Sequence, residues 1–311
     1  MEFGVMVEPQ LGGSYTDLLG IARAAQEAGF TSIARSDHYL AGEDSVPATE
    51  ALSTIAGLAR ETETIKLAVL VTPLTFRHPA VIAKTAATLD EMSDGRFELG
   101  IGTGWMESEH RAFGIDLPAM RLRFSLLFET LAYVHAAFGR SQGGYQGRHY
   151  HLEDIPILPR PTANLSIVVG GTGMQRTPSL AGRFADEYNM FACDADTLAA
   201  RVSVMTATAE GLDRDPGDVK ISIMSSAIIG EDEAEYRELL SAAAASRGRE
   251  AEQLEASLRD RRVLHGTYEQ AAEQVAQYAA EGVGRIYIQH FDALSELDAG
   301  DFSRQLKGIR G

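Results

Sequence analysis

The segment IKLAVLVTPLTFRHPAVIAKTAATLDEMSDGRFELGIG, residues 65–102, contains one complete repeat of the pattern that decides the fold. An apolar, β-rich run, Ile65–Val71, precedes an amphipathic window that begins at Pro79, and a second apolar run, Phe97–Gly102, follows. Continuous apolar runs of this kind are typical of strands that are covered on both faces. The segment therefore predicts a strand, a helix and a second strand parallel to the first.

The same alternation recurs about eight times along the chain. The other predicted strands are Phe3–Val7, Ser32–Arg35, Leu165–Gly171, Glu187–Phe191, Val219–Gly230 and Arg285–Phe291. Helical windows are expected between and after them, including 118–138, 194–210, 231–245, 246–262, 267–281 and 302–309, with Thr267 as an N-cap. Eight strand and helix repeats predict an α/β fold, a closed (β/α)8 TIM barrel.

One segment interrupts this pattern. Residues 140–160 combine glycines, alternating polarity and prolines, which predicts a small hairpin and loop insertion. No linker is long enough to divide two domains, so residues 1–311 are expected to form a single domain.

The composition limits the partners of the chain. Its formal net charge of −16 would repel nucleic acid and anionic membranes, so neither is expected as a partner. The sequence begins MEFGVMVEPQ, without a basic leader, and contains no apolar run long enough to span a bilayer. Cys193 is the only cysteine. These features predict a cytoplasmic protein that binds a small molecule, and an anionic ligand would need a local pocket to overcome the net charge.

Polar residues follow the second and third predicted strands, at the end of a barrel where active sites lie. Asp37 and His38 are candidates for a hydrogen bond or proton relay to a bound ring, because histidine titrates near neutral pH. The alternative is that Asp37 caps a turn and His38 is a surface residue. The later loop with Arg77 and His78 favours a simpler interpretation, in which Pro79 starts the next helix.

After the fourth strand comes GIGTGWMESEH, Gly100–His110. Trp105 occupies the sixth position of a dinucleotide fingerprint, so that motif fails. Glycines here would let the backbone approach a planar ligand, with Trp105 walling the substrate side and Glu107, Ser108 and Glu109 adding polar contacts. The alternative is that the barrel interior needs small residues and Trp105 is buried core. Glu109 and His110 together suggest only a solvated or packed helix face.

The fifth strand ends in the strongest local signal, VVGGTGMQRT, residues 168–177. Glycines at 170, 171 and 173 form a compact loop before a helix, an arrangement that directs backbone N–H groups and the helix dipole at an anion. Arg176 in the first helical turn is explained if a phosphate binds there. A tight turn without a ligand is the alternative.

Other chemistries lack support in this sequence. No paired-histidine helical spacing predicts a zinc site, and no metal is expected. A nucleophile elbow, a Walker loop and a signature around Cys193 are all missing from the sequence.

These segments resemble the luciferase-like flavin/deazaflavin oxidoreductase superfamily, and within it the branch that uses coenzyme F420, an 8-hydroxy-5-deazaflavin. The resemblance is carried by RSDHYL, TPLTFRHPAVIAKTAATLDEMSDGRFELGIGTGW, GGTGMQRTPSLAGRFADEYN and GTYEQAAEQVAQYAAEGVGRIYIQ. They cover most of the chain in the family's order. The resemblance implies a luciferase-like barrel and suggests a homodimer.

The resemblance also implies roles for individual residues. It places Asp37 and His38 beside the deazaflavin ring and a non-proline cis peptide near Val69–Leu70, against the back of the ring. The contacts that it implies with the ring, the ribityl chain or the phosphate come from Thr103, Gly104, Ser108, Gly171, Thr172, Gly173 and Met174.

The chain departs from the pattern of the sugar-phosphate dehydrogenases. They carry an acidic residue after Gly-Thr-Gly, where this chain has Trp105, and a tryptophan soon after Asp-His, where it has Ala41 and Gly42. A substrate that is apolar or aromatic on its accessible face is therefore expected.

The resemblance thus implies an F420-dependent oxidoreductase that transfers a hydride between the deazaflavin and a small organic substrate. Two alternatives stay open: an FMN-dependent monooxygenase that uses reduced flavin and O2, and a non-catalytic cofactor-binding paralogue.

Overall fold

Eight parallel strands form a closed barrel in the computed structural model, which describes residues 1–41, 46, 48–163, 165–297 and 299–310. Gly42 therefore lies outside the described residues. Around the barrel the strands follow the order β1-β12-β9-β8-β7-β4-β3-β2. They are β1 (Glu2–Val7), β2 (Ser32–Arg35), β3 (Lys66–Pro73), β4 (Phe97–Gly102), β7 (Ser166–Gly170), β8 (Glu187–Phe191), β9 (Lys220–Ser225) and β12 (Val283–Gln289). The predicted TIM barrel is confirmed.

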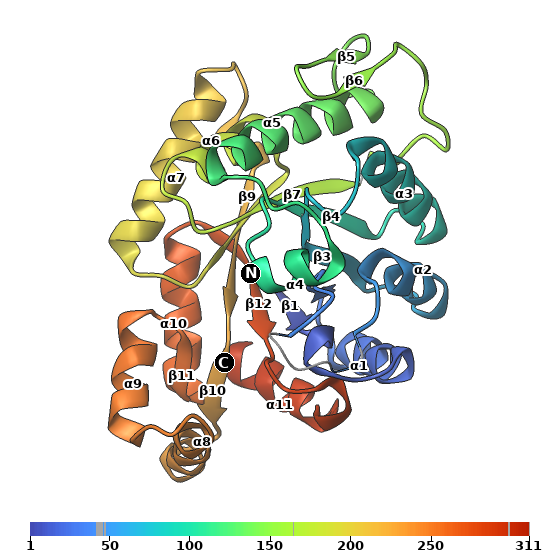
Figure 1. Ribbon diagram of the computed structural model, residues 1–311. Helices are drawn as coiled ribbons and strands as arrows, with labels where there is room; N and C mark the ends of the chain where they lie inside the picture. The colour runs from blue at the N-terminus through green and yellow to red at the C-terminus, as the bar shows by residue number, and fades with distance from the viewer. Residues whose placement is uncertain (42–45, 47, 164, 298, 311) are drawn as a thin grey trace.

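Helices surround the barrel and run back along its outer wall (Figure 1). They are α1 (Tyr15–Ala28), α2 (Ala51–Glu61), α3 (Pro79–Met92), α5 (Met120–Ala137), α6 (Arg176–Phe184), α7 (Ala195–Glu210), α10 (Tyr268–Ala280) and α11 (Ala299–Arg310). Local sequence sets several of their starts. Ser14 caps α1, Thr267 forms a capping box with Gln270 at the start of α10, and Pro79 opens α3 as predicted.

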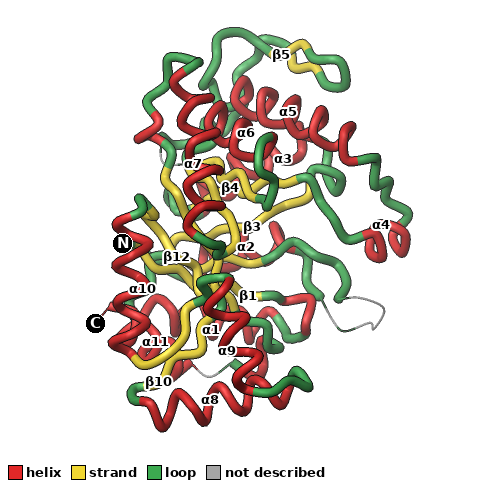
Figure 2. The backbone as a smooth tube through the Cα atoms, turned by 90° about the vertical axis from the view of Figure 1, so that its left-hand side faces the viewer, coloured by secondary structure: helices red, strands yellow, loops and turns green. Residues whose placement is uncertain are grey.

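Shorter elements extend the barrel. A short helix, α4 (Glu107–Phe113), follows β4 and projects beyond the end of the barrel (Figure 2). The predicted insertion contains a two-stranded hairpin, β5 (Tyr145–Gln146) and β6 (His151–Leu152), so the expectation for residues 140–160 is confirmed. Short 3-10 turns occur at Pro9–Leu11, Pro216–Asp218 and Leu294–Glu296. No helix in the described part of the chain is both long and apolar enough to cross a membrane.

The predicted strand Val219–Gly230 is wrong as a single element. It divides into β9, which is part of the barrel, and β10 (Ala227–Gly230), which pairs in parallel with β11 (Leu264–Thr267) outside it. The helices α8 (Glu233–Ser246) and α9 (Ala251–Asp260) connect β10 to β11, and Figure 1 shows these four elements at one corner of the molecule. A continuous apolar run carries no signal for such a change of sheet, which explains the error.

A non-proline cis peptide lies near Val69–Leu70, as expected, one bond further along the chain. The non-proline cis bond joins Leu70 to Val71 rather than Val69 to Leu70. The register of β3 against β4 shifts between Val69 and Thr72, and the cis bond lies within this irregular part of the strand.

The apolar core has two layers. The larger layer fills the space between the barrel and its helices. A small inner cluster, with Met6, Ala34, Leu70, Val168 and Tyr287 among its members, fills the barrel itself. Polar residues lie beyond this inner cluster at both ends of the barrel, and the two ends differ in what they can bind.

Candidate active site at the carboxyl ends of the strands

His38 lies at the carboxyl end of β2 and is held by a buried carboxylate. Its Nδ1 donates to Glu109 Oε1 at 2.9 Å, and Glu109 Oε2 accepts from the Tyr39 amide at 3.0 Å. Burial disfavours the imidazolium, but the hydrogen bond and charge of Glu109, aided by Glu8 and Asp37, raise the pKa of His38 above its usual value. The alternative that His38 is a surface residue is therefore wrong.

Glu109 was expected only as one of three polar contacts, and its bond to His38 was not predicted. It lies on α4 and is 1% exposed, whereas its neighbour Glu107 is exposed. His110 is also buried, with Nδ1 donating to the Met106 carbonyl and Nε2 accepting from Thr75 Oγ1, each at 2.7 Å. The face that carries Glu109 and His110 is thus packed, and one of its residues orients His38.

Trp105 is exposed at the rim. Its indole is 66% exposed and meets the imidazole of His38 edge-on, with 5.6 Å between ring centroids and 78° between planes. The alternative that Trp105 belongs to the buried core is wrong. Thr103 and Ser108 are half-buried near it.

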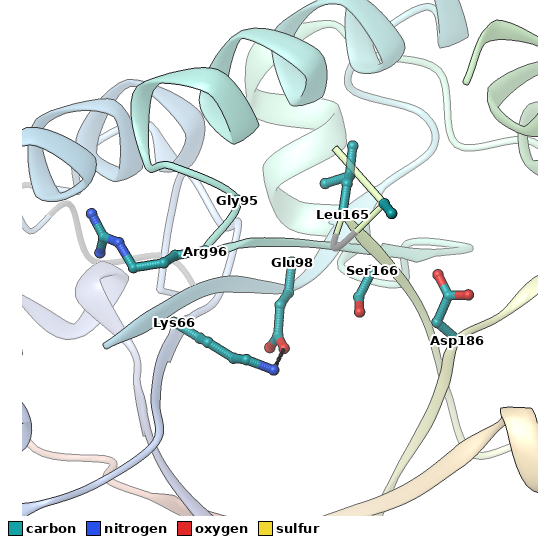
Figure 3. A pocket seen from close by; sticks show the side chains of 8 residues that line it. Lys66, Gly95, Arg96, Glu98, Leu165, Ser166 and Asp186 are labelled. Carbon is teal, nitrogen blue, oxygen red and sulfur yellow. Dashed lines mark ion pairs between the residues drawn. The ribbon is translucent and has the colours of Figure 1, made fainter. Parts of the chain in front are cut away.

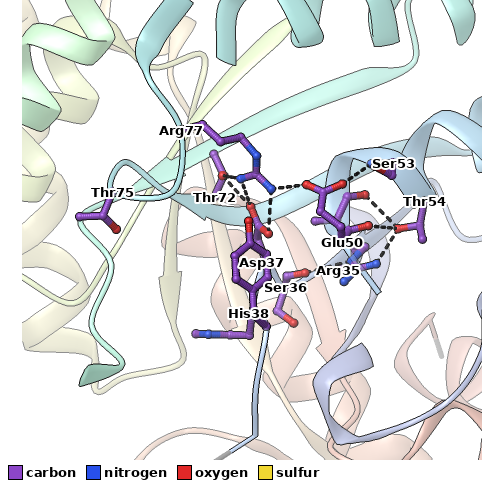
Figure 4. A network of polar contacts seen from close by, with 12 residues as sticks. Arg35, Ser36, Asp37, His38, Glu50, Ser53, Thr54, Thr72, Thr75 and Arg77 are labelled. Atoms are coloured by element: carbon purple, nitrogen blue, oxygen red, sulfur yellow. Dashed lines mark hydrogen bonds and ion pairs between the residues drawn. The ribbon is translucent and has the colours of Figure 1, made fainter. Parts of the chain in front are cut away.

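Asp37 is buried in a polar network rather than capping a turn (Figure 4). Its Oδ2 accepts from Thr72 Oγ1 at 2.6 Å and from Arg77, which also bonds to Oδ1 at 3.2 Å. Arg77 also donates to Thr72 Oγ1 at 2.7 Å, and its second carboxylate partner is Glu50. The loop that begins at Pro73 therefore supplies a charge that fixes Asp37, a role that the sequence analysis did not assign to Arg77.

A second buried network lies across the mouth of the barrel. Glu8 follows β1 and accepts from Gln10 Nε2 and Gln289 Nε2, each at 2.6 Å. Ser36 donates to the side-chain carbonyl of Gln10, also at 2.6 Å. Glu8 could have been predicted as a site residue, because it follows the first strand as Asp37 and His38 follow the second.

The glycines of β4 serve packing first. A Cβ atom on Gly100 would lie 2.0 Å from the Val69 carbonyl oxygen, and one on Gly102 would lie 2.4 Å from Val71. The packing alternative is therefore correct for these two positions. Gly104 differs, because its φ of +73° is left-handed and its carbonyl accepts from the guanidinium of Arg123.

The anion loop, defined here as residues 171–174, joins β7 to α6. Gly171 has a φ of +153°, and its amide donates to the Asn189 carbonyl at 3.2 Å. Among the described residues, no acceptor pairs with the amides of residues 172–177, and Gln175 provides no side-chain cap for α6. The helix start thus presents unpaired N–H groups.

These residues fit an anionic ligand group. The orphaned amides supply donors, and Thr172 and Met174 are exposed. Arg176, also exposed, stacks on Phe124 at 5.3 Å and forms no ion pair with a described carboxylate. Arg176 therefore provides a local positive charge in a chain whose net charge is −16.

The opposite end of the barrel holds a hollow of about 470 Å³, but its charged side chains already have partners within the protein (Figure 3). Glu98 bonds to Arg285 and forms an ion pair with Lys66 at 3.3 Å, while Asp186 pairs with Arg140. The rim is therefore a better candidate for the functional site than this hollow.

The sequence matches the model of the luciferase-like monooxygenase family over residues 1–285. It is 35% identical over 174 residues to an F420-dependent glucose-6-phosphate dehydrogenase of Microbacterium testaceum, covering 55% of this chain and 51% of that protein. It is 29% identical over 195 residues to the pyrimidine monooxygenase RutA of Acinetobacter baylyi, covering 60% and 50%. The chain thus spans about half the length of these curated relatives.

A solved structure of an F420-dependent secondary alcohol dehydrogenase, in complex with an F420-acetone adduct, superposes with a TM-score of 0.79 at 19% identity, covering 100% of this chain and 99% of that one. This likeness supports the fold alone. Together with the match over residues 1–285, the barrel and its rim establish that the chain belongs to the luciferase-like monooxygenase family.

Proposed function

We propose that this chain is an F420-dependent oxidoreductase that transfers a hydride between the deazaflavin and a small organic substrate. The proposal depends on one observation: two features occur at the same rim of the barrel. One is the loop at residues 171–174, whose amides have unpaired N–H groups, and the other is the hydrogen-bonded pair of His38 and Glu109. The F420-dependent relatives support the choice of cofactor.

The residues proposed to hold the cofactor lie on three strand ends. Gly171, Thr172, Gly173 and Met174 would bind its phosphate, and Thr103, Gly104 and Ser108 its ring or ribityl chain. The segment from Val69 through Leu70 to the cis-bonded Val71 would lie behind the ring. When bound, the deazaflavin would supply the carbon that gives or accepts the hydride.

His38 is proposed to hold and move the accompanying proton. Its Nδ1 is hydrogen-bonded to Glu109, so Nε2 is the ring nitrogen left to transfer the proton. Asp37 is proposed to act by position, because Thr72 and Arg77 occupy its carboxylate oxygens and fix the segment that carries His38. Replacing His38 with Gln is expected to lower kcat while leaving the Kd for the cofactor within about threefold.

The substrate is proposed to be apolar or aromatic on the face that meets the protein. Trp105 offers a largely exposed indole beside His38, and Glu107 at the start of α4 would contact polar edges of the substrate. A sugar phosphate suits this rim poorly, since Trp105 occupies the position of the acidic residue in such enzymes.

An FMN-dependent monooxygenase is the second candidate, favoured by the similarity to the pyrimidine monooxygenase. A non-catalytic cofactor-binding protein is the third. Titration of the purified protein with F420 and with FMN, monitored by fluorescence and by thermal shift, tests all three. Tight binding of F420 with hydride transfer to an acceptor supports the first, and oxygen uptake with reduced FMN supports the second. Binding of either cofactor without turnover supports the third.

A cytoplasmic location and a homodimer complete the proposal. Sedimentation of the purified chain at several concentrations tests the dimer.

A further inference from the structure

A buried arginine contacts the anion loop, and no carboxylate among the described residues neutralises its charge. Arg201 lies on α7 and is 8% exposed. Its Nη2 donates to the Thr172 carbonyl oxygen at 2.7 Å, and its Nη1 lies 3.7 Å from Cys193 Sγ. Its Nε is buried without an acceptor, and Arg201 forms no ion pair within the described part of the chain.

This arrangement is unfavourable for the protein alone. A guanidinium withdrawn from water normally gains a carboxylate or several strong acceptors, because burial removes its hydration. Arg201 gains one backbone carbonyl, and the thiol of Cys193 is a weak acceptor. The charge is therefore largely uncompensated, and it lies beside a loop whose own amides are unpaired.

A second buried arginine provides an internal comparison. Arg123 on α5 is also 8% exposed, donates from Nε to the Pro118 carbonyl at 2.8 Å and bonds to the carbonyl of Gly104. The loops that contain Gly104 and Thr172 thus each have an arginine of their own. Only Arg201 contacts the loop that is suited to an anion.

We propose that Arg201 is a positioning residue that makes the anion loop selective for ligands carrying a phosphate. It fixes the peptide of Thr172, so that the neighbouring amides remain free to donate, and it places a positive charge beside them where little water weakens its field. In this proposal the loop that contains Gly104 contacts the planar ring. This inference rests on the proposed function.

The test compares ligands that differ only in the part beyond the ribityl chain. Kd values are measured by fluorescence for F420 against its phosphate-free core, 8-hydroxy-5-deazariboflavin, and for FMN against riboflavin. Arg201→Met should weaken the phosphate-bearing members about 10- to 100-fold, because bonds and charges that serve an ion are lost. The phosphate-free members should change by less than about threefold. Arg201→Lys, which keeps the charge, should recover part of the loss.

Two further variants separate this role from a general structural one. Arg214 also donates to backbone carbonyls, those of Gly182 and Ala185, but at the far end of α6, so Arg214→Met should leave both members of each ligand pair unchanged. Arg123→Met should weaken the phosphate-bearing and phosphate-free ligands alike.

The stability of the ligand-free protein gives a second readout. Removing an uncompensated buried charge should leave the Tm of Arg201→Met unchanged or higher, while the Tm shift caused by F420 shrinks. A lower ligand-free Tm, or equal weakening of F420 and its phosphate-free core, would overturn the inference while the proposed function stands. An Arg201→Met chain that does not fold would overturn the inference in the same way. Failure of the unaltered protein to bind F420 or FMN would overturn both.

Discussion

At the scale of single residues, the protonation of His38 depends on one carboxylate. Glu109→Gln keeps the size of the side chain and an acceptor for the Tyr39 amide, but removes the negative charge. Burial then acts on the imidazole with less opposition, so the pKa of His38 should fall. An NMR pH titration of the histidine side chains measures it, with the His38 signal assigned by its loss in His38→Gln.

The matched control is Glu107→Gln, which removes an exposed carboxylate from the same helical turn and should leave the titration of His38 unchanged. A pKa for His38 that stays the same in Glu109→Gln would contradict the assigned role of Glu109.

Glu187 makes a pH-dependent contribution to stability from the opposite end of the barrel. Burial raises its pKa to about 7, with repulsion from Glu98 adding to the effect and Arg285, Ser222 and Lys220 opposing it. The unfolded carboxyl titrates near 4.5, so across this interval the folded state holds a proton that the unfolded chain releases. Stability therefore falls as pH rises from about 4.5 to about 7.

Glu187→Gln should remove this dependence. Urea unfolding should give a free energy of unfolding higher than that of the unaltered protein by on the order of 3 kcal/mol at about pH 8, and by on the order of 1 kcal/mol at about pH 5. Glu2→Gln is the control of opposite sign. Burial opposes ionisation of Glu2, but Lys220 and Arg285 lower its pKa to about 2, so its stabilisation is present above about pH 4.5 and lost below. A loss of stability in Glu187→Gln at both pH values would mean that Arg285 needs this carboxylate.

At the scale of elements, the contact between β3 and β4 depends on a missing side chain. A Cβ atom on Gly100 would meet the backbone of Val69, which has no free rotamer to move aside. Gly100→Ala should therefore destabilise the protein by about 3 kcal/mol in urea unfolding. Gly20, inside α1, has open space around its Cβ position, so Gly20→Ala should stabilise by about 0.5–1 kcal/mol. Equal effects at the two glycines would contradict the packing role of Gly100.

The elements also show what the sequence can and cannot predict. Strand and helix order follows from local patterns, because each buried run and each cap, such as Thr267, is encoded within a few residues. Pairing across the chain is not encoded in this way. Arg77 and Glu109 reach Asp37 and His38 from about 40 and 70 residues away, and no spacing in the sequence indicates it. For the same reason β11, whose partner is β10, was not predicted.

At the scale of the whole molecule, the polar groups at the two ends of the barrel differ in how they are paired. The amino end closes on ion pairs among its own residues, centred on Arg285. The carboxyl end keeps unpaired donors at the anion loop and the uncompensated charge of Arg201. Because a buried charge or donor without a partner costs stability, the position of Arg201 beside the unpaired amides of the anion loop is the physical argument for a ligand there.

The last prediction concerns whether the chain unfolds as one domain. The elements β10, α8, α9 and β11 have a small apolar cluster of their own, which includes Leu240. However, Ser226 alone separates β10 from the barrel strand β9, and β11 ends at Thr267, the N-cap of α10. The cluster therefore cannot open without disturbing two parts of the barrel wall, and we expect a single cooperative unit.

Leu240→Ala, at a fully buried position, should cost about 2–5 kcal/mol. Hydrogen exchange measured by mass spectrometry gives the free energy of opening for each peptide. If the chain is one unit, this free energy should fall by the same amount in peptides of the cluster and in the slowest peptides of β4, on the far side of the barrel. Leu239→Ala, next to it but 42% exposed, should change exchange by less than about 0.5 kcal/mol in both places. Faster exchange confined to residues 231–263 in Leu240→Ala would instead show that this corner opens alone, and the chain would then contain two cooperative units.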